Sequence, residues 1–84
     1  MTTPAPKTAA EIQDWLLSYI ARELKVAPAA VDVQARFVDL GLSSRKSVLL
    51  AGDLEDWLGQ PIAPDLTWDH PSIAALAGHL GQPA

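Results

Sequence analysis

The chain has 84 residues, no cysteine and a formal net charge of −4. This length is enough for one small domain and leaves little room for an enclosed active site, which weighs against an enzyme. The lack of cysteine excludes disulfides, thiolate zinc sites and a cysteine nucleophile, so any thiol must come from a cofactor. The acidic balance argues against nucleic acid and favours docking on basic patches of partner proteins.

The two ends of the chain differ in composition from its middle. We expect a flexible lead-in over residues 1–7, a folded domain over 8–81 and a tail over 82–84. The start has neither the basic residues nor the apolar run of a signal peptide. No apolar stretch approaches the ~20 residues needed to span a bilayer. We therefore expect a cytoplasmic protein that does not enter a membrane.

The first helix is predicted from Thr8 to Leu24. Thr8 and Glu11 have the spacing of a capping box, which marks a helix start. Apolar residues then recur at intervals of three and four, as in an amphipathic helix. They are Ile12, Trp15, Leu16, Tyr19, Ile20 and Leu24. The helix is expected to end ahead of Pro28, because the residue before proline disfavours the helical conformation.

A long loop is predicted from residue 29 to residue 41, followed by a second helix from Ser44 to Leu58. Loops longer than about 12 residues tend to be functional or pinned by their own side chains, and we expect both here. Gly59 and Pro61 would end the second helix. The expected apolar anchors of the loop are Val31, Val33, Phe37 and Leu40.

The last part of the chain is predicted to hold a short helical turn over 64–69 and a closing helix. Pro71 would lie in the first turn of that helix, with Asp69 or His70 as its cap. Since no alternating strand pattern appears, we predict an all-α fold, a small four-helix bundle with three main helices and one short helix. The apolar stripe of the closing helix is Ile73, Leu76, Ala77 and Leu80.

The aromatic and histidine side chains receive structural interpretations. Trp15, Trp57 and Trp68 are expected in the core or at its edge rather than as base-stacking residues. His70 is interpreted as a neighbour of the helix cap and His79 as a surface residue. The two histidines lack the spacing of metal ligands, so no metal site is predicted.

A glycine turn followed by a serine stands at the start of the second helix. Its sequence is Asp39-Leu40-Gly41-Leu42-Ser43-Ser44. This run resembles the Leu-Gly-x-Asp-Ser-Leu motif of the acyl carrier family, and Pro71-Ser72-Ile73-Ala74-Ala75-Leu76-Ala77 resembles the family's closing segment. The resemblance covers residues 11–80 and implies 4'-phosphopantetheine attached to Ser44. Gly41, Leu42 and Ser43 would form the supporting turn.

The resemblance also implies a set of partners. A phosphopantetheinyl transferase would load the arm from coenzyme A, an acyl-activating ligase would add the cargo, and a ketosynthase or condensation enzyme would receive it. Such a carrier catalyses nothing and is expected to be a monomer. Ser43 replaces the aspartate of the family motif and Arg45 replaces its final leucine, which puts recognition by a general-purpose transferase in doubt.

The serines also have a simpler interpretation, because serine at a helix start most often serves only as a cap. Ser44 has no base of its own nearby in the sequence, and nothing supplies an oxyanion hole, so a serine hydrolase is not predicted. The two interpretations are compatible, since Ser43 can cap the helix while Ser44 is modified.

A partner-binding face is predicted on the outer side of the second helix. Projection at 100° per residue places Arg45, Leu49, Gly52 and Asp56 there, with Ser47, Leu50, Ala51, Leu54 and Leu58 on the inner side. Leu49 is interpreted as a hydrophobic docking contact, or alternatively as an ordinary exposed leucine. The basic pair Arg45 and Lys46 would attract the phosphodiester or an acidic patch on a partner, or would only be solvated. The acidic cluster of Asp53, Glu55 and Asp56 would meet basic residues on ligases or synthases, or would likewise only be solvated.

A finer resemblance concerns the cargo. Residues 52–59 and 63–66 are similar to carriers paired with fatty acyl-AMP ligases, which implies a starter or loading carrier in polyketide or lipopeptide biosynthesis. The alternatives are a peptidyl carrier of a nonribosomal peptide synthetase and a docking bundle without a cofactor, the latter suggested by Ser43 and Arg45.

Overall fold

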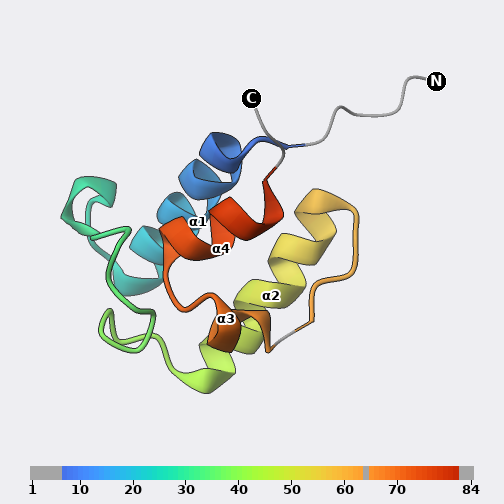
Figure 1. Cartoon of the computed structure of the whole chain (residues 1–84). Helices are drawn as coiled ribbons and strands as arrows, with labels where there is room; N and C mark the ends of the chain where they lie inside the picture. Colours follow the sequence, from blue (N-terminus) through green and yellow to red (C-terminus); the bar gives the residue numbers. More distant parts are fainter. Residues whose placement is uncertain (1–6, 64, 82–84) are drawn as a thin grey trace.

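The computed structural model describes residues 7–63 and 65–81. In this part of the chain the elements are α1 (Ala9–Leu24), a 3-10 turn η1 (Pro28–Ala30), α2 (Ser44–Leu58), α3 (Leu66–Asp69) and α4 (Ile73–Leu80). The described residues form no strand, only an isolated bridge between Arg36 and Ser72. The predicted all-α bundle with three main helices and one short helix is confirmed (Figure 1). Apart from Lys7, the predicted lead-in over 1–7 and tail over 82–84 lie outside the described residues.

The start of α1 is fixed by the predicted capping box. The Thr8 hydroxyl accepts from the Glu11 backbone N–H at 3.2 Å, and the Glu11 carboxylate accepts from the Thr8 backbone N–H at 3.2 Å. The helix ends at Lys25, which adopts a left-handed conformation with φ of 60°. Its N–H and that of Val26 then bond to carbonyls of the last turn, which satisfies groups that a helix end leaves unpaired.

The core joins the inner faces of the three longer helices with anchors from the loops. α1 lies alongside α4, and Trp15 of α1 stacks on Trp57 of α2 with ring centroids 5.3 Å apart. The predicted inner face of α2 is confirmed at Leu50, Ala51 and Leu54. The fully buried large side chains are Ile12, Leu16, Ile20, Leu50, Leu54, Ile73 and Leu76.

The long loop between α1 and α2 is pinned, as predicted. Val31 and Phe37 are buried, and Val33 and Leu40 pack against the core. The loop is also tied to the start of α4, because the Phe37 N–H donates to the Pro71 carbonyl at 2.7 Å and the Ala74 N–H donates to the Val33 carbonyl at 3.0 Å. These bonds fix the position of the loop end from which α2 begins.

The predicted start of α4 is wrong. The helix begins at Ile73, and its N-cap is Ser72, whose hydroxyl accepts from the Ala75 N–H at 3.1 Å. Pro71 lies before the helix, and His70 is the C-cap of α3 instead. The reason is tertiary: the extended Ser72 pairs with Arg36 and the Pro71 carbonyl bonds to the loop, so these residues continue the loop contact rather than the helix.

The prediction for the tryptophans is correct for two and wrong for the third. Trp15 and Trp57 are half-buried at the core edge. Trp68, however, is 76% exposed. α3 has only four residues and turns Thr67 toward the core in its place, so the indole is left at the surface. No helix among the described residues is long and apolar enough to cross a bilayer.

Candidate functional site

The turn before α2 is built by Gly41 and Leu42. Gly41 has a φ of +91°, in the left-handed region that glycine adopts without strain. Leu42 is 5% exposed, and its N–H donates to the Phe37 carbonyl at 3.0 Å. Leu42 therefore anchors the chain in the core immediately before the two exposed serines. The left-handed conformation of Gly41 provides the change of chain direction that lets Leu42 reach the core.

Ser43 and Ser44 have different positions at the start of α2. Ser43 is the N-cap: its hydroxyl accepts from the Lys46 N–H at 3.2 Å and its carbonyl accepts from the Ser47 N–H at 2.9 Å. Ser44 is the first helical residue and is exposed. Because Ser43 fulfils the capping role, the Ser44 hydroxyl is not needed to hold the helix start.

The helix start fits a phosphate group on Ser44. Within the described part of the chain, the backbone N–H groups of Ser44 and Arg45 make no hydrogen bond. Free N–H groups and the positive end of the helix dipole together favour an anion. The first turn of α2 contains no acidic side chain that would compete for this position.

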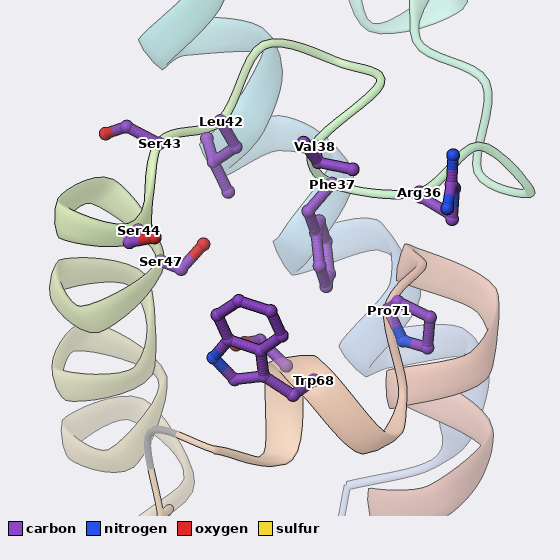
Figure 2. Close-up of a pocket in the computed structure, with 10 residues that line it drawn as sticks. Arg36, Phe37, Val38, Leu42, Ser43, Ser44, Ser47, Trp68 and Pro71 are labelled. Carbon is purple, nitrogen blue, oxygen red and sulfur yellow. The ribbon is translucent and has the colours of Figure 1, made fainter.

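An apolar hollow of about 510 Å³ opens beside Ser44 (Figure 2). In Figure 2, Leu42 and Phe37 reach into it from the loop, Ser47 directs its hydroxyl into it from α2, and the Trp68 indole forms the opposite wall. Ser43 points away. Sequence reasoning missed this hollow, because its walls come from segments far apart in the chain.

Arg45 and Lys46 lie in the first turn of α2, and Arg36 lies across the hollow from Ser44 (Figure 2). Lys46 forms an ion pair with Glu23 of α1 at 3.5 Å, and Arg36 of the hollow's rim pairs with Asp39 at 3.0 Å. The pairing with Asp39 raises the pKa of Arg36. Among the described residues no ion pair forms at Arg45, which leaves its charge available beside Ser44.

The predicted outer face of α2 is exposed, but its acidic residues differ in their surroundings. Leu49 is 58% exposed, and the neighbouring Val48, which the helical projection does not single out, is 53% exposed. Gly52 is exposed, and an added Cβ would meet nothing within 4 Å. Asp53 accepts a hydrogen bond from the Tyr19 hydroxyl at 2.7 Å. Asp53 therefore contributes to the packing of α1 against α2, whereas the exposed Asp56 has no hydrogen bond or ion pair within the described residues.

The two histidines come together, which the sequence did not indicate. The rings of His70 and His79 stack with centroids 4.0 Å apart. The pair joins the end of α3 to the last turn of α4. Within residues 7–63 and 65–81, no three histidine or acidic side chains gather in a group able to hold a metal ion.

The geometry defines a class: a small helical domain that presents a serine at an exposed helix start. The family model described as "Phosphopantetheine attachment site" matches residues 14–80. Its prosthetic group is 4'-phosphopantetheine. The chain therefore belongs to the phosphopantetheine-binding carrier family, as the sequence resemblance indicated. It is a carrier of the polyketide and peptide synthesis type, and carriers of this family are non-catalytic.

Two relatives illustrate the range of proteins that contain this domain. A phenolphthiocerol/phthiocerol polyketide synthase of Mycobacterium tuberculosis is 39% identical over 74 residues, which is 88% of this chain but 4% of that protein. Acyl carrier protein TtuC of Teredinibacter turnerae is 37% identical over 70 residues, covering 83% of this chain and 80% of the relative. The chain thus spans only a small part of the synthase and most of the acyl carrier protein.

Solved structures agree with the fold. The acyl carrier protein Asl1650 of Anabaena, described as having a variant phosphopantetheinylation-site sequence, superposes with a TM-score of 0.85 at 40% identity, covering 96% of this chain and 92% of that one. A free-standing peptidyl carrier protein of Acinetobacter baumannii gives a TM-score of 0.81 at 34% identity, covering 87% and 91%.

Proposed function

We propose that this protein is an acyl carrier whose 4'-phosphopantetheine arm is attached to Ser44. The observation that carries the proposal is the division of roles between the two serines. Ser43 caps α2, so Ser44 can lose its hydroxyl proton and accept a phosphodiester without loss of the cap. The chain has no cysteine, and the arm supplies the terminal thiol on which an acyl group is held as a thioester.

The loading step needs an external transferase. The Ser44 Oγ attacks the β-phosphorus of coenzyme A, a P–O bond forms, and the pyrophosphate bond breaks to release adenosine 3',5'-bisphosphate. The serine proton passes to a base of the transferase, because Ser44 makes no hydrogen bond to a base within the described residues. The free N–H groups and Arg45 would then face the single negative charge of the phosphodiester.

For the cargo, we propose a fatty acyl chain delivered by a fatty acyl-AMP ligase, and a starter or loading role in polyketide or lipopeptide assembly. This rests on the resemblance of residues 52–59 and 63–66 to carriers of that kind, together with the polyketide synthase relatives. The alternative cargo is an aminoacyl group, and the likeness to a peptidyl carrier protein supports it.

For the partner surface, we propose the outer face of α2. Leu49 would provide the apolar contact, Gly52 would permit close approach, and Arg45, Lys46 and Asp56 would supply charges at the two ends. Asp53 is exposed and would also contact a partner, although its hydrogen bond with the Tyr19 hydroxyl gives it a structural role as well. A ketosynthase or condensation enzyme would use the same face, since the arm emerges at its start.

The attachment site is tested by the intact mass of the purified protein after incubation with coenzyme A and a broad-specificity phosphopantetheinyl transferase. We expect the wild type and Ser43→Ala to gain one phosphopantetheine and Ser44→Ala to gain none. Ser47→Ala is the matched control, since Ser47 also faces the hollow. A gain retained in Ser44→Ala would contradict the assignment of Ser44. No gain in the wild type with several transferases would favour the cofactor-free docking bundle.

The cargo and the partner face are tested on the modified protein. Incubation with ATP, candidate ligases and acids, followed by intact mass, identifies the acyl group that is transferred. Leu49→Glu should take the arm normally but accept the acyl group slowly. Equal acylation rates for the variant and the wild type would exclude Leu49 as a docking contact.

A further inference from the structure

The wall of the hollow opposite Ser44 is a tryptophan that the fold itself does not require. Trp68 is 76% exposed, while its neighbour Thr67 contacts the core. An exposed indole loses the favourable free energy that burial of its apolar surface would give. Large apolar surfaces that remain exposed often mark binding sites. Val38, on the loop side of the same hollow, is 67% exposed. Two of the exposed large apolar side chains thus border one concave surface.

This surface lies within reach of the arm, because Ser44 itself lines the hollow. A volume of about 510 Å³ falls within the ~300–1,000 Å³ typical of small-molecule sites. Tethering raises the effective concentration of the arm at the hollow to about millimolar, so a contact of only millimolar affinity would occupy about half of the molecules.

We propose that the hollow between the Phe37 loop, α2 and Trp68 is a binding site for the part of the pantetheine arm next to the phosphate, with Trp68 as its principal contact. This inference rests on the proposed attachment to Ser44. Trp68 is then a positioning residue that holds the arm against the protein between visits to partner enzymes.

The chemistry of the arm matches the walls of the hollow. The group next to the phosphate is a pantoyl unit, which has two methyls on one carbon, a hydroxyl and an amide. The methyls suit the apolar surface of Phe37, Leu42 and Trp68, which reach into the hollow. The Ser47 hydroxyl, which points into the same space (Figure 2), can donate to or accept from the pantoyl hydroxyl or amide. A few polar groups among apolar walls are the usual composition of a site that orients a small ligand.

The test is an NMR measurement on the holo-protein, loaded with ¹³C-labelled pantetheine and without any partner enzyme. We expect nuclear Overhauser contacts from the pantoyl methyls to the Trp68 indole and the Phe37 ring, together with a shift of the Trp68 indole N–H signal relative to the unmodified protein. Trp68→Ala should lose these contacts, and Trp68→Phe should keep those to Phe37.

Val26→Ala is the matched control, because Val26 is an apolar side chain 44% exposed and does not line the hollow; it should leave the contacts unchanged. The two-dimensional spectrum of each variant reports whether it is folded. A modified protein whose pantoyl methyls show no contact with either ring overturns this inference and leaves the attachment to Ser44 intact. A protein that gains no phosphopantetheine overturns the proposed function itself.

Discussion

The two longest helices, α1 and α2, have similar lengths but opposite charge arrangements. α1 has an acidic residue, Glu11, in its first turn and a basic one, Arg22, in its last, as the helix dipole favours. α2 has no acidic residue in its first turn and no basic residue in its last. Its sequence places Arg45 and Lys46 at the start and three acidic residues toward the end, which is the unfavourable order.

The outer surfaces of the two helices differ in the same way. α2 leaves Val48 and Leu49 more than half exposed and has a glycine, Gly52, within the helix, where glycine costs about 0.5–1 kcal/mol relative to alanine. No apolar residue of α1 is among the large side chains that remain exposed. In α1 the charges and apolar residues favour stability, whereas α2 has an arrangement that costs some stability and that fits the anion and partners we propose for its outer face.

The largest effect expected from this comparison is at two leucines. Leu16 of α1 is fully buried and Leu49 of α2 is 58% exposed. Leu16→Ala should lower the free energy of unfolding by about 2–5 kcal/mol, because it leaves a cavity. Leu49→Ala should change it by no more than ~0.5 kcal/mol, as for surface substitutions. Chemical denaturation checks both, and a destabilisation by Leu49→Ala as large as that of Leu16→Ala would refute the difference between the two faces.

The contact between the two helices gives an intermediate effect that depends on pH. Burial, and then the hydrogen bond to Asp53, raises the pKa of Tyr19 from its ordinary value of 10.0 to about 12. Since the folded state holds this proton more tightly, the stabilisation is complete below pH 10 and falls as the pH rises toward 12. Tyr19→Phe should cost about 1 kcal/mol at neutral pH.

Unfolding curves measured between pH 8 and ~12 test this dependence on pH. A tyrosine hydroxyl can lose its proton in this range and a phenylalanine ring cannot, so the two proteins should differ in how their free energy of unfolding changes with pH. The stability of Tyr19→Phe should decline less steeply with pH than that of the wild type. Parallel declines would show that the Tyr19 hydroxyl does not couple proton binding to folding.

A smaller effect is expected at Gly52. Gly52→Ala should raise the free energy of unfolding by about 0.5–1 kcal/mol, because the added methyl group meets nothing. Gly78→Ala in α4 is the matched control, since it is also free of close contacts. Both variants should be stabilised, but only Gly52→Ala should slow acyl transfer from the ligase. If the two variants were loaded equally fast, Gly52 would have no role in close approach.

The smallest effect is expected from reversing a charge at the start of α2. Arg45→Glu places an anion in the first turn and should stabilise the unmodified protein by about 0.3–1 kcal/mol at low ionic strength. The gain should shrink in concentrated salt, because exposed charges are screened. Thermal unfolding at two salt concentrations measures this. A loss of stability on Arg45→Glu would mean that the Arg45 side chain makes a favourable interaction in the unmodified protein.

Local sequence patterns are sufficient to predict α1, with its capping box, and α2, from Ser44 to Leu58. These elements depend on caps, apolar periodicity and a stop signal, which are contained in neighbouring residues. The same patterns fail at α4, because Ser72 is held extended by Arg36 from a distant loop. Nothing in the local pattern around Pro71 reports that contact.

The site could be predicted in part for the same reason. Gly41, Leu42 and Ser43 act locally, and the structure places them in the turn that leads into Ser44. The exposure of Trp68 and the hollow that it borders depend on how a four-residue helix sits against a loop. Periodicity cannot be measured over so few residues, so the sequence wrongly predicts a core position for this tryptophan.

The most direct test is the free energy of unfolding of the protein before and after phosphopantetheine is attached. If the start of α2 is arranged for an anion, the phosphodiester on Ser44 should supply the missing negative charge. The modified protein should be more stable by about 0.3–1 kcal/mol at low ionic strength, and the difference should diminish as salt is added. Equal stability of the two forms, or a less stable modified form, would contradict the claim that α2 gives up stability in favour of the arm.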